Sequence, residues 1–184
     1  MSALTPIYTI GYGNRLLVEF LETLRQHEIA CLVDIRTAPY SRFRPEFSRE
    51  ALEALLKEQE VRYVYLGREL GGRPDDPECY VDGKVEYEHV KERAAYRKGI
   101  ERLQRAQSQG MRMVLMCSEG RAEECHRSKL VAPSLGELAI PVLHLEPDGS
   151  VITQDEVLRE LTGGQLNLFG DPAFTSRKRY PGES

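Results

Sequence analysis

The sequence has few cysteines, no long apolar run and no excess of positive charge, and each absence excludes a class of protein. Four cysteines among 184 residues are too few for a disulfide scaffold, so we expect a protein of the reducing cytoplasm. No window reaches the roughly 18 consecutive apolar residues of a membrane span, and MSALTPIYTIGYGN lacks the basic start and apolar run of a secretory signal. A net charge of −4 argues against binding nucleic acid by bulk charge alone.

Apolar residues make up 41% of the chain, enough to bury the core of one domain. Short apolar runs predict strands at 6–12, 29–36, 61–67, 111–117 and 140–145. Amphipathic stretches predict helices at 17–27, 48–59, 87–107, 122–138 and 153–162, with Ser48 and Thr153 as N-caps. This alternation predicts an α/β fold, a single domain over residues 1–161 whose mostly parallel five-stranded sheet carries helices on both faces. Residues 162–184 are expected to form a flexible C-terminal tail.

Polar and reactive side chains follow the predicted strands, where parallel α/β sheets bind their ligands. Arginines dominate two of these segments, and a guanidinium fork suits phosphate or carboxylate. Tyr40, Phe43 and Phe47 interleave with them and offer stacking surfaces for bases. Alternatively, the arginines pair with nearby carboxylates in a solvated loop. The expected ligand-binding residues are Asn14, Asp34, Arg36, Tyr40, Arg42, Arg44, Arg73 and His144.

The segment after the fourth predicted strand carries the most reactive groups. A thiol at a helix N-terminus near arginines should have a lowered pKa, which predicts a reactive Cys117. The loop is similar to the active loops of rhodanese sulfurtransferases and thiol phosphatases, but Arg121 follows Cys117 too early for their Cys-x5-Arg spacing. Alternatively, Glu119 is the nucleophile or acid–base group. The expected catalytic residues are Cys117, Glu119, Cys125, His126 and Arg127.

Two other interpretations of this segment stay open. Cys117, Cys125 and His126 could bind zinc, with Cys79 or His144 as a fourth ligand, but the segment lacks the close Cys-x2-Cys pair of most structural zinc sites. We therefore expect no cofactor and no metal. The cysteines could also be small buried residues without chemical function.

Five motifs occur in order along the chain: TIGYGNR, LVDIRTAPYSRFRPEF, YLGRELGGR, MCSEGRAEECHR and VLHL. Together they resemble the domain-of-unknown-function family 488 (DUF488) over residues 7–145. The resemblance implies the same fold and the same site, with importance for the paired cysteines Cys117 and Cys125. It implies no reaction, because the family has no assigned function.

The C-terminal tail contains a short motif that resembles the bacterial peptide that binds the DNA sliding clamp. Leucine and phenylalanine side chains can fill an apolar pocket, and the glutamine supplies a directional hydrogen bond. Alternatively, the motif packs back on the domain as a latch. The expected partner-binding residues are Gln165, Leu166, Leu168 and Phe169.

Three functions are compatible with these observations. The first is an enzyme of DNA repair that acts on DNA or a nucleotide and is recruited by the sliding clamp. The second is a small-molecule thiol enzyme for sulfur transfer or phosphate-ester chemistry. The third is a non-catalytic adaptor. The first explains both the arginines and the tail motif, so we take it as the leading hypothesis.

Overall fold

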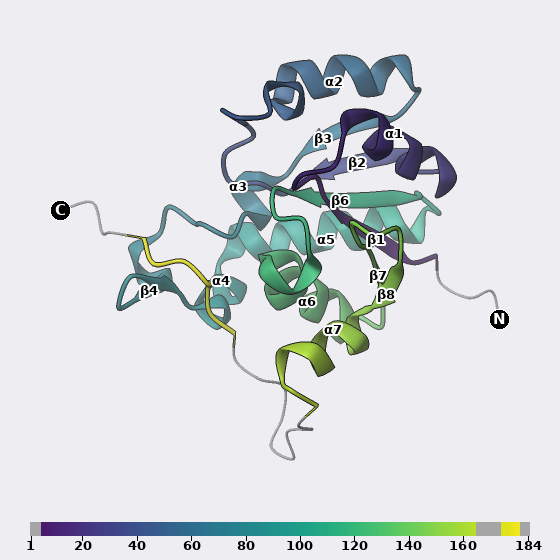
Figure 1. Cartoon of the computed structure of the whole chain (residues 1–184). Coiled ribbons are helices and arrows are strands. Elements are labelled where there is room, and N and C mark those ends of the chain that lie inside the picture. Colours follow the sequence, from purple (N-terminus) through teal and green to yellow (C-terminus); the bar gives the residue numbers. More distant parts are fainter. Residues whose placement is uncertain (1–4, 165–173, 181–184) are drawn as a thin grey trace.

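The computed structural model describes residues 5–164 and 174–180. Their centre is a six-stranded sheet in the order β3-β2-β6-β1-β7-β8, in which only β8 is antiparallel to its neighbour (Figure 1). The strands are β1 (Ile7–Gly11), β2 (Cys31–Asp34), β3 (Arg62–Tyr65), β6 (Met113–Cys117), β7 (Val142–Leu145) and β8 (Val151–Thr153). The α/β class and the mostly parallel sheet are confirmed.

The prediction of five strands is wrong, because β8 adds a sixth. The chain turns back after β7 through Gly149, whose φ of +85° favours glycine, and β8 pairs with β7 over three residues. A separate two-stranded hairpin, β4 (Tyr80–Val81) and β5 (Lys84–Val85), also lies outside the predicted elements. Elements of two or three residues are too short to produce a readable periodicity.

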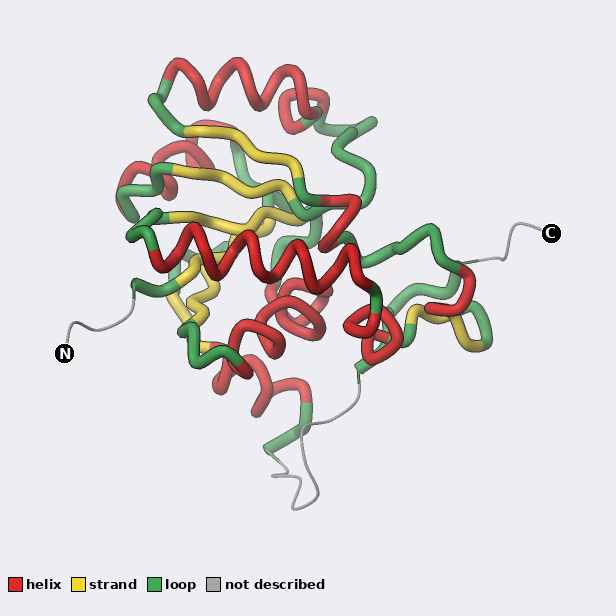
Figure 2. Tube along the Cα trace, turned by 180° about the vertical axis from the view of Figure 1, so that it is seen from behind, coloured by secondary structure: helices red, strands yellow, loops and turns green. Residues whose placement is uncertain are grey.

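Helices cover both faces of the sheet, as predicted. Leucine and phenylalanine side chains of α1 (Leu17–Gln26) and α2 (Arg49–Glu58) pack on one face. The other face packs against α3 (Gly67–Leu70), α4 (Tyr87–Glu92), α5 (Ala94–Ser108) and α6 (Ala132–Glu137). Figure 2 shows α5 crossing the sheet on this side. The last helix, α7 (Gln154–Leu161), follows β8. No helix of residues 5–164 or 174–180 has the length and apolarity needed to cross a membrane.

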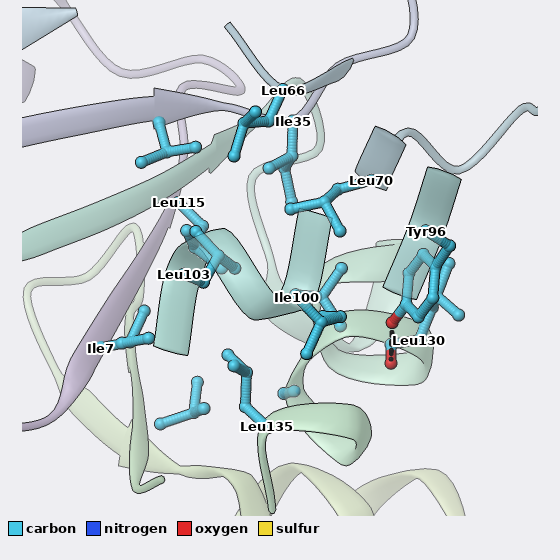
Figure 3. Close-up of a cluster of buried hydrophobic side chains, with 14 of the residues drawn as sticks. Ile7, Ile35, Leu66, Leu70, Tyr96, Ile100, Leu103, Leu115, Leu130 and Leu135 are labelled. Atoms are coloured by element: carbon cyan, nitrogen blue, oxygen red, sulfur yellow. Dashed lines mark hydrogen bonds between the residues drawn. The ribbon is translucent and has the colours of Figure 1, made fainter. Parts of the chain in front are cut away.

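The sheet separates two apolar clusters, because successive side chains of a strand point to opposite faces. In β1, Ile7 belongs to the cluster under α5, and Ile10 belongs to the cluster under α1. Figure 3 shows the first cluster, where Tyr96 reaches down and donates its hydroxyl proton to Leu130 O at 3.1 Å or to Ser134 Oγ at 2.8 Å. A buried hydroxyl needs such partners.

Two predicted helices are interrupted. The stretch 87–107 breaks into α4 and α5 at Arg93, whose backbone is extended, with a ψ of 133°. The stretch 122–138 starts as a short 3₁₀ turn, η3 (Ala122–Glu124), continues as a π-type turn, η4 (Arg127–Val131), and only then becomes α6. Ser48 precedes α2 but makes no side-chain cap bond, whereas Thr153 caps α7 by accepting from the Glu156 amide.

Candidate active site

A cavity of about 380 Å³ opens at the carboxyl ends of β2 and β6. Five segments of the chain meet there, because β2 and β6 are neighbours in the sheet and the end of the described chain folds back over them. Its lining consists of Arg36, Thr37, Ala38, Gly72, Arg73, Tyr87, Cys117, Ser118, Glu119, Glu124, Cys125, His126, Ser176, Arg177, Lys178 and Tyr180. Both cysteines of the sequence motif therefore lie in one cavity with several cationic side chains.

Arg127 is fully buried behind the cavity and holds the loop after β6 in place. Its Nη1 donates to Cys117 Sγ at 2.8 Å and to Glu119 O at 2.9 Å, and its Nη2 donates to Gly120 O at 2.7 Å. Burial lowers the pKa of Arg127, but the neighbouring Cys117, Cys125 and Glu146 raise it above its usual value. Arg127 is thus a permanent buried cation that positions the reactive segment, and it does not line the cavity.

The thiol of Cys117 differs from the expectation. Burial raises the pKa of Cys117 well above its usual value, a hydrogen bond with Cys125 raises it further, and Arg127 lowers it only in part. The predicted lowering of the pKa is therefore wrong. Its premise was a helix N-terminus at the thiol, but Cys117 ends a strand and the next regular helix, α6, starts fifteen residues later.

Cys125 and His126 form the second part of the reactive cluster. Cys125 Sγ lies 3.4 Å from His126 Nδ1 and accepts the Arg127 backbone N–H at 3.5 Å. His126 Nε2 lies 3.2 Å from Ile35 O, and since a carbonyl only accepts, Nε2 carries the proton. In the neutral ring, His126 Nδ1 therefore presents a lone pair toward Cys125. Gly72 packs on this ring so closely that a Cβ there would lie 2.7 Å from His126 Cγ.

Glu119 completes the cluster. Burial alone would raise the pKa of Glu119, but His126 and hydrogen bonds from backbone, Cys125 and Ser118 lower it below its usual value. Ser118 Oγ donates to Glu119 Oε2 at 3.1 Å. One carboxylate oxygen of Glu119 and the two sulfurs of Cys117 and Cys125 all lie within 4.8 Å of one another. An ionised carboxylate thus faces two thiols in one small volume.

Arg36 supplies a buried cation to the cavity lining. Its Nε and Nη2 donate to the two carboxylate oxygens of Asp34 at 2.9 and 2.6 Å, and Tyr63 donates to the same carboxylate at 2.6 Å. Burial and Asp34 both raise the pKa of Tyr63. Asp34 therefore orients Arg36 and does not itself line the cavity. Arg36 Nη1 is buried and has no hydrogen-bond partner among the residues that the structure describes.

The end of the described chain, 174–180, supplies cavity residues that the sequence analysis did not predict. Thr175 bridges Glu86 antiparallel to it, and Ser176 Oγ accepts the Val85 N–H at 2.9 Å. Tyr180 then stacks under the Arg73 guanidinium, with 4.7 Å from Arg73 Cζ to the ring centroid. The cationic and aromatic side chains of residues 177–180 could have indicated a role at the site. Because this segment has no amphipathic period, its sequence does not indicate where it packs.

Several expected ligand-binding residues lie outside the cavity lining. Arg44 donates to Gly13 O and pairs with Glu46 at 2.7 Å, so it ties loops together. His144 is fully buried on β7, between Thr9 and Gln154, and no residue of β7 lines the cavity. Asn14, Tyr40 and Arg42 are exposed. Cys79 and His144, the suggested fourth zinc ligands, are likewise absent from the lining. Of the expected catalytic and ligand-binding residues, the cavity is lined by Arg36, Arg73, Cys117, Glu119, Cys125 and His126.

The sliding-clamp-like motif, Gln165–Phe169, lies outside the described residues, so its docking stays a prediction.

Comparison with known proteins identifies one family. A family model described as "Domain of unknown function DUF488" matches residues 16–132, well over half of the chain, and the chain belongs to this family. The match spans the Arg36 and Arg73 segments and the whole reactive loop from Cys117 to Arg127. No curated protein and no solved structure matches the chain.

Proposed function

We propose that this DUF488 protein is an enzyme of DNA repair that acts on a nucleotide or on one nucleotide unit of DNA. The observation that supports this proposal is the composition of one cavity. Cys117, Glu119, Cys125 and His126 meet cationic side chains from three other segments there. Reactive groups next to fixed cations are the arrangement that chemistry on a phosphate-bearing substrate requires.

The cations of the cavity suit a phosphate group. Arg36 lines the cavity with a guanidinium that Asp34 already orients, and Arg73 and Lys178 lie exposed at the same cavity. A planar guanidinium binds phosphate oxygens through two parallel donors. A volume of about 380 Å³ falls at the lower end of small-molecule sites, which span about 300–1,000 Å³. It suits a single nucleotide unit better than a duplex.

Glu119 and His126 are the acid–base groups of this site. Glu119 is ionised because its pKa is lowered, so it can accept a proton from water or substrate. His126 Nδ1 offers a second proton acceptor next to Cys125. Cys117 is a poor free nucleophile, since its raised pKa keeps it protonated. Acid–base chemistry centred on Glu119 is therefore the preferred mechanism.

Recruitment by the sliding clamp complements this site. The chain carries a net charge of −4, so its intrinsic attraction to the DNA backbone is small. Binding of Gln165, Leu166, Leu168 and Phe169 to a clamp that encircles DNA would raise the local DNA concentration without requiring a basic surface. This part of the proposal rests on the sequence motif.

The enzymatic proposal is tested with the purified full-length chain. The protein is incubated with nucleoside phosphates and with oligonucleotides that each carry one damaged base, and products are identified by mass spectrometry. We expect conversion of one class of substrate, slowed at least about 100-fold by Glu119→Gln, the loss typical of an acid–base group. If no member of either panel is bound or converted, the nucleotide function is refuted, and the small-molecule thiol enzyme becomes the better hypothesis.

A matched pair of arginine variants tests where the substrate binds. Arg73 lines the cavity, whereas Arg42 is exposed outside it. Arg73→Gln should weaken substrate binding about tenfold or more, because a hydrogen bond to a charged group contributes about 1.5–3 kcal/mol. Arg42→Gln should bind normally. Equal losses in both variants would contradict binding in the cavity.

Clamp recruitment is tested separately. The full chain is titrated against a bacterial sliding clamp, with the Leu168→Ala/Phe169→Ala double variant as control. We expect micromolar binding that disappears in the double variant. Binding that the double variant retains, or none at all, would remove the clamp from the proposal without affecting the cavity.

A further inference from the structure

The thiol–carboxylate cluster has the composition of a metal site. Cys117 Sγ, Cys125 Sγ and a Glu119 oxygen lie within 4.8 Å of one another. Ligand atoms around one zinc ion lie about 3.5–3.8 Å apart when the bonds are about 2.0–2.3 Å long. The cluster therefore needs only small side-chain movements to enclose an ion. Two sulfurs and one oxygen form a donor set that suits Zn²⁺ better than Mg²⁺ or Ca²⁺.

The surroundings of the sulfurs match those of thiolate ligands. Cys117 Sγ accepts from Arg127 Nη1 at 2.8 Å, and Cys125 Sγ accepts from the Arg127 backbone N–H at 3.5 Å. Such outer hydrogen bonds orient and stabilise metal-bound thiolates. Cys31 and Cys79, by contrast, belong to the apolar cluster under α5 and to no group of three or more potential metal ligands among the described residues.

The charges of the cluster also favour a divalent cation. When both sulfurs lose their protons to bind an ion, the two sulfurs and the Glu119 carboxylate carry three negative charges in a buried volume, and the single positive charge of Arg127 is shared with Glu146 at 3.9 Å. Uncompensated buried charge is costly. A divalent ion would offset the excess. All three residues line the cavity, and His126 lies beside Cys125 in the same lining.

We propose that Cys117, Glu119 and Cys125 bind one Zn²⁺ whose fourth position faces the cavity and takes water or substrate. Binding releases the two thiol protons to solvent, and both sulfurs coordinate as thiolates. The inference rests on the same cavity as the proposed function and changes one role within it. Glu119 becomes a ligand, and His126 is the group that moves protons.

Metal binding is tested on the full-length chain without any substrate. Metal-free protein is prepared with a chelator and titrated with Zn²⁺, and with Co²⁺ as a coloured probe. We expect one ion per chain and a sulfur-to-cobalt charge-transfer band. Cys117→Ala and Cys125→Ala should each weaken binding at least about 100-fold, more than the 10–100-fold typical of an outer partner. Cys79→Ala, also a buried cysteine, should leave it unchanged.

X-ray absorption on the zinc-loaded wild-type protein supplies a readout that needs no variant. Two sulfurs at about 2.3 Å from zinc are expected. The metal site would be overturned by any of three results: less than one zinc ion bound per chain, no sulfur among the atoms that coordinate zinc, or zinc binding by Cys125→Ala as tight as by the wild type. Nucleotide binding, measured in parallel on the metal-free protein, keeps this failure distinct from failure of the proposed function.

Discussion

At the residue scale, His144 shows how a buried ring acquires a single protonation state. Gln154 Nε2 donates to Ser128 O, so its Oε1 must accept the proton of His144 Nε2 at 2.8 Å. His144 Nδ1 then accepts the Thr9 hydroxyl proton at 2.6 Å. Both ring nitrogens are satisfied only in the neutral form. Burial lowers the pKa of His144 to about 4, a hydrogen bond to Gln154 raises it in part, and Arg127 lowers it further.

This depressed pKa makes stability depend on pH in a defined window. Below pH 6.5 the unfolded chain protonates this histidine, while the folded chain excludes the proton until about pH 4. The free energy of unfolding should therefore fall as the pH drops from 6.5 to 4, by up to about 3 kcal/mol from this group. Urea titrations of wild type and His144→Asn measure the effect. The variant should be less stable at pH 7, but its free energy of unfolding should change less between pH 6.5 and 4. An equal pH dependence in both proteins would contradict the neutral state of His144.

Gly11 makes a second residue-scale prediction, since it lets β1 approach the reactive loop. A Cβ on Gly11 would lie 1.5 Å from Glu119 O and 2.4 Å from Arg127 Nη1. Gly11→Ala should therefore displace the loop and destabilise the fold by at least about 1–3 kcal/mol. The matched control is Gly136→Ala in α6, where nothing lies within 4 Å and the change should be neutral or stabilising. Thermal unfolding compares the stability of the two variants with that of the wild type. A Gly11→Ala variant as stable as the wild type would refute the close contact.

The candidate site could be predicted from sequence only as far as strand ends determine it. Cys117 ends β6 and Arg36 follows β2, so the strand-end rule brings both to one edge of the sheet. The same rule misplaces Arg44, because an arginine that satisfies backbone carbonyls has the same sequence signature as one that faces a ligand. It also cannot tell that Cys117 is enclosed, since burial depends on Arg127 and on β1.

At the scale of elements, the segment 174–180 stabilises the hairpin of β4 and β5. Ser176 Oγ accepts the Val85 N–H and donates to Lys178 O at 2.7 Å. Ser176→Ala would leave a buried amide unpaired, at a cost of about 1–3 kcal/mol. We expect faster amide hydrogen exchange at Val85 and in the hairpin, with the exchange of β6 unchanged. Equal acceleration throughout would indicate global destabilisation instead.

The five predicted strands and the first two helices were predicted correctly because their apolar patterns are strong, whereas the two longest predicted helices are interrupted for local reasons. Strands β1, β2, β3, β6 and β7 are confirmed. The break at Arg93 escapes a periodicity argument because the apolar side chains resume at helical spacing on the other side of one extended residue. The segment 174–180 has no period at all; its position depends on single hydrogen bonds to distant residues.

At the scale of the whole molecule, the net charge of −4 leads us to expect that, if the proposed function holds, the contacts with nucleic acid are limited to the cavity. With Arg36, Arg73 and Lys178 as the phosphate contacts, the logarithm of the affinity for a short single strand should fall with the logarithm of salt concentration with a slope of about −2. The slope is measured by fluorescence anisotropy titrations of a labelled single strand at salt concentrations between about 50 and 200 mM. A slope of −6 or steeper would show that a surface outside the cavity binds the backbone.

The position of β1 has a consequence for biosynthesis. The first strand of the chain lies in the middle of the sheet, between β6 and β7, with Gly11 aligned to Cys117. During translation, β1 leaves the ribosome long before the strands that flank it, and it waits without a partner until Met113–Cys117 and Val142–Leu145 have been made. Parallel pairings between such distant segments form slowly. The loop from Cys117 to Arg127 is therefore assembled only at the end of folding, so we expect a nascent or truncated chain to lack the candidate cavity.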